Sequence, residues 1–199
     1  MRKNEKSEWE KLLDSEPYRS DDAKLVSLRR KSRELLQIYN NLDENLVNYR
    51  SILSKLLGTE VGENVFIQPP FYCDYGVNIH IGENFMANFN CVILDCAPVT
   101  FGDHVLLGPN VQIYAVGHPT DPVTRALPID VPKAINIGNH VWIGGGSIIL
   151  PGVTIGDNVI IGSGSVVTKD IESDVIAAGN PCRVIRRLNP EDYGTKMMI

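Results

Sequence analysis

The stretch from Ile137 to Val167, IGNHVWIGGGSIILPGVTIGDNVIIGSGSVV, repeats with a period of six residues. An aliphatic residue opens each unit, at Ile137, Ile143, Ile149, Ile155, Ile161 and Val167. Neither the 3.6-residue period of a helix nor the two-residue period of a simple strand gives this spacing. A period of six predicts a parallel β-helix, in which short strands wind around a prism and successive coils stack about 4.8 Å apart.

Upstream of this stretch the repeat is present but irregular. Aliphatic–glycine pairs continue at Val61, Ile81, Phe101 and Leu107, each followed by glycine. Because Ile81 and Phe101 are 20 residues apart, which is no multiple of six, we expect insertions in the first coils.

Residues 115–134 contain four prolines and lack the repeat, although Ile113 and Ile137 on either side are 24 residues apart and in phase. We expect a loop that leaves the prism and returns to it, and long loops inside compact domains are usually functional. An edge turn at the prolines is the alternative.

The N-terminal segment, residues 1–57, is expected to be helical. Ser20, Asp21 and Asp22 form a plausible N-cap and acidic first turn for a helix that runs to about Asn40. Asp43 could cap a further helix. Gly58 follows that helix at the position where a residue with left-handed backbone conformation is expected. The segment is too short for a core of its own, so we expect it to cover one end of the prism.

Composition and charge narrow the function classes. The net charge of −5 argues against general nucleic-acid binding, and no apolar run approaches the roughly 18 residues of a membrane span. The N-terminus lacks the apolar region of a signal peptide, and the four cysteines show no CxxC pairing. We therefore expect a mainly β protein of the cytoplasm with reduced thiols. Its expected divisions are a helical segment (1–57), a β-helix (58–188, with the loop at about 115–134) and a tail (189–199).

Four histidines are candidates for chemistry. His104 and His140 occupy equivalent turn positions before strands, and His80 alternates with buried isoleucines and would face outward. His118 differs, because it lies between Gly117 and Pro119 where the coil gives way to the loop. Imidazole, with an unperturbed pKa of about 6.5, suits proton removal from an alcohol near neutral pH. A histidine that merely occupies a turn is the competing interpretation.

Two further stretches could support acyl transfer. Gly144-Gly145-Gly146 offers backbone N–H groups that no side chain crowds, as an oxyanion requires, although Gly144 is also a repeat corner. The basic residues of the stretch 183–187, with Thr168 and Lys169 one coil earlier, could bind the phosphates of a nucleotide-like cofactor. A solvated charge run is the commoner explanation of such clusters.

An ordered set of motifs resembles the maltose/galactoside O-acetyltransferases of the hexapeptide-repeat acyltransferase superfamily. The resemblance covers nearly the whole chain. Its motifs are Glu16–Ser20, Tyr39–Asn40, Cys73–Ile79, Ala87–Asn90, Gly117–Pro119, Asn139–Gly144, Pro151–Gly156, Val167–Asp170 and Gly179–Pro181.

The resemblance implies a left-handed prism and a homotrimer with active sites between subunits. It also implies acetyl-CoA as donor, a sugar hydroxyl as acceptor, and no metal. His118 matches the general base of the family. The resemblance places Asp74, Asn88 and Asp95 at or beside the acceptor pocket. It places Trp142, Gly145, Ser163, Thr168, Lys169, Arg183 and Arg186 along acetyl-CoA.

The chain also departs from the family pattern. Some relatives have a second acid where this chain has Cys96, a serine in place of Asp74, and an N-terminal aspartate near Ser20. The acceptor pocket is therefore the least transferable part of the resemblance. Its CDYG and CVILD stretches look closer to the maltose-type members.

The expected function is acetyl transfer from acetyl-CoA to a maltose-, glucose- or galactoside-like sugar. His118 would deprotonate the hydroxyl, a backbone N–H near Gly144-Gly145 would hold the oxyanion, and Asn88 and Asp95 would orient the sugar. No covalent acyl-enzyme is expected, because both substrates can meet in one cleft.

Other functions use the same kind of prism. A γ-type carbonic anhydrase needs three histidines on a metal, two of them close in sequence, whereas the histidines here are 24, 14 and 22 residues apart. A non-catalytic trimer is a third possibility, and the Gly-His-Pro motif argues against it. Xenobiotic and serine acetyltransferases share the prism, but the N-terminal helical segment and the GHPTDP loop favour the sugar group.

Overall fold

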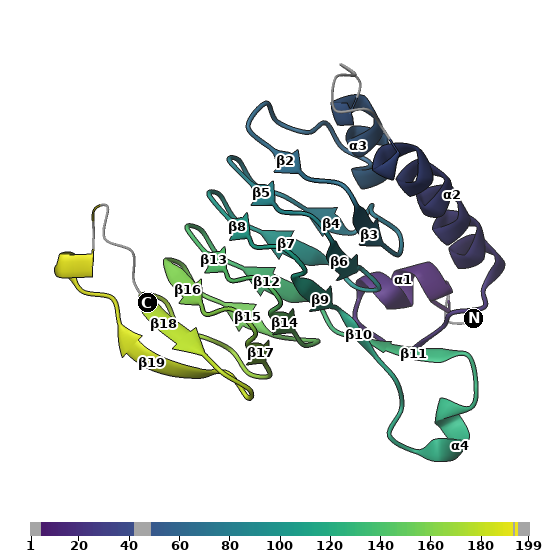
Figure 1. Ribbon diagram of the computed structural model, residues 1–199. Helices are drawn as coiled ribbons and strands as arrows, with labels where there is room; N and C mark the ends of the chain where they lie inside the picture. Colours follow the sequence, from purple (N-terminus) through teal and green to yellow (C-terminus); the bar gives the residue numbers. More distant parts are fainter. Residues whose placement is uncertain (1–4, 42–48, 193, 195–199) are drawn as a thin grey trace.

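The computed structural model describes residues 5–41, 49–192 and 194, and its centre is a three-sided coil of short strands (Figure 1). The helices are α1 (Glu8–Leu13), α2 (Ala23–Asn40), α3 (Tyr49–Leu57) and α4 (Pro122–Arg125), with the 3-10 helix η1 (Pro190–Asp192) near the C-terminus. None of the described helices is both long and apolar enough to cross a membrane.

Three parallel sheets of seven, five and four strands form the sides of the coil. The seven-stranded sheet contains β2 (Phe66–Ile67), β5 (Met86–Ala87), β8 (Leu106–Leu107), β13 (Trp142–Ile143), β16 (Val159–Ile161), β18 (Val175–Ala178) and the antiparallel β19 (Arg183–Arg187). The five-stranded sheet contains β3 (Phe71–Cys73), β6 (Cys91–Leu94), β9 (Gln112–Tyr114), β14 (Ile148–Ile149) and β17 (Val166–Val167). The four-stranded sheet contains β4 (Ile79–His80), β7 (Val99–Phe101), β12 (Ile135–Ile137) and β15 (Thr154–Ile155).

The aliphatic repeat fills the inside of the prism. Its six members are all buried, at Ile137, Ile143, Ile149, Ile155, Ile161 and Val167. Each pairs in register with the inward residue of a neighbouring coil, as Ile143 does with Ile161 and Val167 with Ile149. The six-residue period and the parallel β-helix predicted from it are therefore confirmed.

Departures from the six-residue period fall at one corner, between the five-stranded and the four-stranded sheets. Eight residues separate the inward Cys73 and Ile81 there, and 24 separate Ile113 and Ile137. The other two corners keep the six-residue spacing from Ile67 to Ala177. The expected insertions in the first coils are confirmed, and we call the place where they gather the irregular corner.

The glycines of the regular corners are required by the close stacking of the coils. A Cβ atom on Gly138 would lie 2.4 Å from Asp157 Oδ1 and 2.8 Å from the carbonyl carbon of Gly156. Asp157 cannot withdraw freely, because its Oδ1 accepts the N–H of Asn139 at 2.6 Å. Gly138 therefore stands where two backbones meet.

Gly138→Ala is expected to lower the free energy of unfolding by about 1–3 kcal/mol, the usual cost of overpacking. Urea unfolding measures the change. Gly62→Ala is the matched control, because a Cβ there would meet only Val65 Cγ2, at an ordinary 3.8 Å. Equal losses in both variants would show that the close stacking at Gly138 is not the cause.

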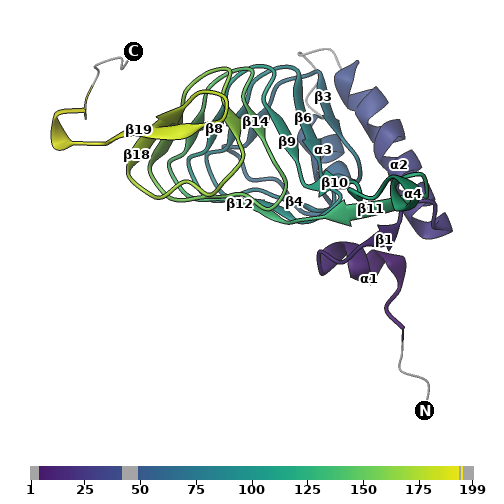
Figure 2. The ribbon, with the colours of Figure 1, turned by 90° about the horizontal axis from the view of Figure 1, so that it is seen from below.

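The N-terminal segment covers the first coil, as expected (Figure 2). Helix α2 begins after Asp22, whose carboxylate accepts the N–H groups of Lys24 and Leu25 at 3.0 and 3.2 Å. Gly58 has the expected positive φ of 70° after α3. The further cap expected at Asp43 lies outside the described residues. The segment is not wholly helical, however, because β1 (Tyr18–Arg19) separates α1 from α2.

The end of α2 binds the open edge of the coil through side chains. Asn40 donates from Nδ2 to the carbonyl of Phe71 at 2.8 Å, and its Oδ1 accepts the N–H of the same residue at 2.8 Å. Tyr39 donates its hydroxyl to the carbonyl of Ile67. The first coil therefore receives from α2 hydrogen bonds that a preceding strand would otherwise supply.

The segment 115–134 projects from the coil, as expected, and is no edge turn (Figure 1). It has structure that the sequence pattern did not indicate. The strands β10 (Val116–Gly117) and β11 (Ile129–Pro132) form an antiparallel pair, with α4 between them, and β11 also pairs with β1. His104 and His140 lie at turns with φ of 58° and 54°, which confirms the turn positions expected for them.

Candidate active site

The irregular corner brings predicted site residues together. Asp74 directly follows β3, Asp95 directly follows β6, and His118 follows β9 and the short β10. These strands are neighbours in the sequence of coils, so the three residues leave the prism from the same corner. The polar side chains of Asp74, Asp95 and His118 thus all come from the irregular corner, where the chain departs from the six-residue period.

His118 faces a carboxylate that the sequence analysis did not single out. Its Nδ1 lies 3.4 Å from Oδ1 of Asp130, which is on the opposite strand of the loop hairpin. The imidazole is 64% exposed, whereas the carboxylate is only 16% exposed. A carboxylate on the Nδ1 side favours a proton there, and this leaves Nε2 as the basic nitrogen for a substrate hydroxyl.

Tyr18 holds Asp130 from the other side. The phenol donates to Asp130 Oδ2 at 3.2 Å, across the pairing of β1 with β11. The side chain is buried, and burial raises the pKa of Tyr18 well above its usual range, so the hydroxyl keeps its proton and acts as a donor. Asp130 is therefore fixed between a phenol and an imidazole.

Asp74 and Cys96 form a second pair at the irregular corner. The thiol of Cys96 donates to Asp74 Oδ2 at 3.1 Å. Burial, and then the nearby carboxylate of Asp74, raise the pKa of Cys96, so it remains a thiol. Cys96 is thus a hydrogen-bond donor rather than a nucleophile. It binds only Oδ2 of Asp74, whose side chain is half-buried.

Asp95 is buried, with no exposed surface, which contradicts the expectation that it contacts the sugar. Its Oδ1 accepts the N–H groups of Asp74 and Tyr75 at 3.0 and 2.8 Å, and its Oδ2 accepts that of Asn78 at 3.3 Å. Burial raises the pKa of Asp95 to about 7, although these N–H groups favour its charged form. Its carboxylate therefore binds main-chain N–H groups of the preceding coil and does not face solvent.

Asn88 lies at a different corner from the other acceptor residues. It follows β5, between the seven-stranded and five-stranded sheets, and its Oδ1 accepts the N–H of Phe89 at 2.8 Å. The structure does not bring Asn88 together with Asp74 or His118 within one chain.

A groove of about 400 Å³ lies on the outer surface of the seven-stranded sheet. Three predicted cofactor residues line it, namely Trp142, Ser163 and Arg186. The rest of its wall is mainly aliphatic, with Ile160, Ile176 and Ile185. An apolar trough with one guanidinium at its side could hold a flexible chain that carries phosphate.

Arg186 is already engaged in the described structure. Its guanidinium donates to both carboxylate oxygens of Asp192 at 2.6 and 2.8 Å. A phosphate ligand would therefore compete with Asp192 for this cation. The guanidinium is 41% exposed, so solvent screens this ion pair and lowers the cost of the exchange.

The other predicted cofactor residues lie outside the groove. Thr168 and Lys169 are exposed and follow β17 at the irregular corner, and Arg183 begins β19 and donates to the carbonyl of Cys182 at 2.7 Å. Gly145 lies next to the groove residue Gly144. Its carbonyl accepts the N–H of Gly164 at 2.9 Å, and its own N–H has no acceptor within the described part of the chain.

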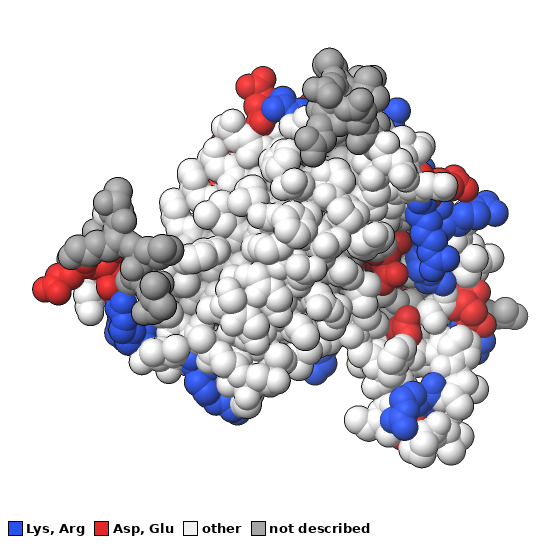
Figure 3. Space-filling model, viewed as in Figure 1, with Lys and Arg blue, Asp and Glu red and all other residues white. Residues whose placement is uncertain are grey.

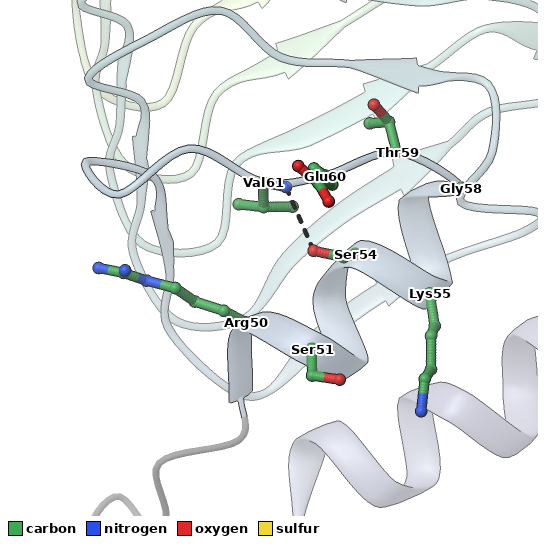
Figure 4. Close-up of a pocket in the computed structure, with 8 residues that line it drawn as sticks. All are labelled: Arg50, Ser51, Ser54, Lys55, Gly58, Thr59, Glu60 and Val61. Carbon is green, nitrogen blue, oxygen red and sulfur yellow. Dashed lines mark hydrogen bonds between the residues drawn. The ribbon is translucent and has the colours of Figure 1, made fainter.

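A hollow of about 560 Å³ lies elsewhere, between α3 and the turn that follows it (Figure 4). None of the predicted site residues lines it. Its cationic side chains, Arg50 and Lys55, point away from each other, and Ser54 accepts the N–H of Val61 at 3.2 Å. These side chains do not converge on a common point.

No sequence motif pointed to Asp130 or Tyr18 as candidate site residues. Asp130 carried one signal, since it stands between Ile129 and Val131 in an otherwise irregular loop. Such alternation indicates a strand with one side turned to a partner. Tyr18 lies 112 residues from Asp130 along the chain, and no local pattern links the two.

Comparison with known protein families matches two parts of the chain. Residues 134–169 match the bacterial transferase hexapeptide model (six repeats), and residues 11–60 match the maltose acetyltransferase hexapeptide capping motif. A relative with high similarity is the galactoside O-acetyltransferase of Escherichia coli, which is 49% identical over 84% of this chain and 83% of that protein.

Solved structures agree with these matches. A maltose O-acetyltransferase from Clostridium difficile superposes with a TM-score of 0.90 at 46% identity, over 94% of this chain and 100% of that one. A galactoside acetyltransferase in complex with coenzyme A gives a TM-score of 0.90 at 42% identity, over 96% of this chain and 97% of that one. The expected mainly β fold, a parallel β-helix of hexapeptide repeats, is thereby confirmed.

Proposed function

Because this chain belongs to the maltose/galactoside O-acetyltransferase family of hexapeptide-repeat acyltransferases, we propose that it transfers an acetyl group from acetyl-CoA to a sugar hydroxyl, with His118 as general base. The observation that carries the proposal is the position of His118, which is exposed at the irregular corner with Asp130 at its Nδ1 side. That arrangement presents Nε2 to an incoming hydroxyl.

The chemistry follows from these groups. His118 takes the proton of the sugar hydroxyl while its oxygen attacks the thioester carbonyl, and Asp130 stabilises the imidazolium. The partly exposed N–H of Gly145 is a suitable donor to the tetrahedral oxyanion, since it has no acceptor among the described residues. Collapse of the intermediate breaks the carbon–sulfur bond, and the imidazolium returns its proton to the thiolate of CoA.

Asp74 is the proposed sugar ligand at the irregular corner. Carboxylates accept hydrogen bonds from pairs of sugar hydroxyls, and Asp74 is the half-buried acid next to the buried Cys96. Maltose-, glucose- and galactoside-like sugars all offer such hydroxyls.

The proposed site lies between subunits, and the location of its parts supports this. His118 and Asp74 leave one corner of the prism, whereas Asn88 lies at another corner and the groove with Trp142 lies on the seven-stranded sheet. A second copy of the chain could bring its groove and its Asn88 to the irregular corner of the first.

The outer faces of the coil support a homotrimer. The outward row of the seven-stranded sheet is apolar, with Phe66, Met86, Leu106, Trp142, Ile160 and Ile176 in register. The row of the five-stranded sheet is largely apolar, with Tyr72, Val92, Gln112, Ile148 and Val166. The row of the four-stranded sheet is polar, with His80, Thr100, Asn136 and Thr154.

A closed ring with head-to-tail contacts uses two different faces of each subunit. Two apolar faces and one polar face fit such a ring, in which the four-stranded sheet meets solvent. Figure 3 shows a broad surface of the coil with few charges, while Lys, Arg, Asp and Glu gather at its ends and on the projecting loop. Uncharged surface of this extent is typical of an interface.

Trp142→Ala is expected to raise the KM for acetyl-CoA by roughly tenfold, because the indole supplies apolar area along the groove. Initial rates at varied acetyl-CoA and saturating sugar measure the change, and sedimentation checks that the assembly is intact. Trp142→Phe keeps an aromatic ring and should lose much less. An unchanged KM in the alanine variant would move the cofactor away from this groove.

The proposed activity is tested by CoA release in the presence of maltose, glucose, galactosides and amino sugars. Acceptor-dependent release with one of these sugars supports the proposal, and mass spectrometry of the product shows which hydroxyl is acetylated. Release that is independent of every sugar tested would contradict it. The four cysteines are free thiols, which fits a cytoplasmic location for this reaction.

A further inference from the structure

Asp95 is a buried carboxyl group for which the proposed mechanism has no chemical role. It has no exposed surface, and both of its carboxylate oxygens accept hydrogen bonds. It accepts the N–H groups of Asp74, Tyr75 and Asn78 through its carboxylate. Its carbonyl also accepts Nδ2 of Asn78 at 2.8 Å. All of its partners belong to one segment of the preceding coil.

That segment, residues 74–78, is an insertion at the irregular corner between β3 and β4. Strand pairing does not supply partners for its N–H groups, and Gly76 turns the chain at a φ of 78°. Buried backbone N–H groups need an acceptor. The Asp95 carboxylate supplies it for three of these five residues, so the shape of the insertion depends on this side chain.

Asp74 is held twice from the next coil by two consecutive residues. Asp95 accepts its backbone N–H at 3.0 Å, and Cys96 donates its thiol to Oδ2 at 3.1 Å. The first contact fixes the main chain of Asp74, and the second fixes the direction of its carboxylate. Asp95 and Cys96 are buried, whereas Asp74 is half-exposed at the rim.

We propose that Asp95 is a positioning residue for acceptor binding, which acts through Asp74 by holding the 74–78 insertion in the conformation that presents the Asp74 carboxylate to the sugar. This inference rests on the proposed function. It replaces the direct sugar contact expected for Asp95 by an indirect one.

Asp95→Asn tests the proposal, because the amide has the same shape but its NH₂ group cannot accept the N–H of Asn78. The expected result is a roughly tenfold higher KM for the sugar. The KM for acetyl-CoA should stay unchanged and kcat within about twofold, because His118 and the groove do not touch Asp95. Equal rises in both KM values would show a general loss of structure and would overturn the proposal.

A double-mutant cycle with Asp74→Ala separates positioning from stability. If Asp95 acts through Asp74, the double variant should have the same sugar KM as Asp74→Ala alone, since no carboxylate remains to be positioned. Additive effects on the sugar KM would mean that Asp95 acts by another route. Thermal unfolding of all four proteins accompanies the kinetics.

If Asp95→Asn does not fold, the Cys96 variants decide. Cys96→Ala removes the donor to Asp74 and should raise the sugar KM several-fold, while Cys96→Ser keeps a donor and should restore it. An unchanged sugar KM in Cys96→Ala would show that sugar binding does not depend on how Asp74 is held from this coil, and it would overturn the proposal. A different outcome contradicts the proposed function itself: the unaltered protein releases no CoA with any sugar. Normal turnover with an unaltered sugar KM in Asp95→Asn overturns only the role of Asp95.

Discussion

Replacing His118 by alanine is expected to lower kcat by about 10²–10⁴-fold, the usual contribution of a positioned general base. The protein should fold normally, because the imidazole is 64% exposed and its loss leaves no cavity. Binding of CoA should persist, since His118 does not line the groove with Trp142 and Arg186. Stopped CoA-release assays measure kcat, and calorimetry measures CoA binding.

His80→Ala is the matched control for this experiment. His80 is also an exposed histidine of the coil, but it lies on the polar face of the four-stranded sheet, paired with Thr100. It should keep near-normal turnover. If His118→Ala also kept near-normal turnover, the proton acceptor would have to be another group.

Asp130→Asn is expected to lower kcat by about a hundredfold, less than the loss found when a fully buried histidine partner is neutralised. The amide cannot stabilise an imidazolium by charge, although it can still accept the phenol hydrogen bond of Tyr18. The KM for acetyl-CoA should remain unchanged, which the same assay shows at saturating sugar.

Asp121→Asn serves as the control, because Asp121 lies in the same loop and caps α4 through the N–H of Thr124. Asparagine caps helices about as well as aspartate, so this variant should remain active. If Asp130→Asn were as active as Asp121→Asn, the imidazole would be oriented without Asp130.

The sequence predicted the prism because burial imposes its own period on the chain. Each coil must place an aliphatic residue inside the prism, in register with those of the neighbouring coils. The spacing of Ile143 and Ile161 can therefore be recognised in the sequence alone. The place of the proposed site was readable for a related reason. The period fails before His118, and a break in a stacked repeat marks chain that leaves the core.

The remaining parts of the site depend on pairings between distant residues. The β1–β11 pairing joins Tyr18 to Asp130 over 112 residues, and two-residue strands carry too little pattern to reveal it. Asp95 was misplaced for a different reason. The resemblance placed it at or beside the acceptor pocket, and only its three main-chain donors explain why a carboxylate is buried there.

The hydrogen bonds that α2 makes to the first coil have a consequence for solubility. An open edge of a parallel sheet is a template for another strand, so an uncovered β-helix could stack end to end into fibres. Asn40 occupies both backbone groups of Phe71, which are the groups that an added strand would use. At the other end, the backbone N–H of Cys182 donates to the carbonyl of Val166 as the chain turns back over β17. The coil is therefore a finite length of a structure that could otherwise polymerise.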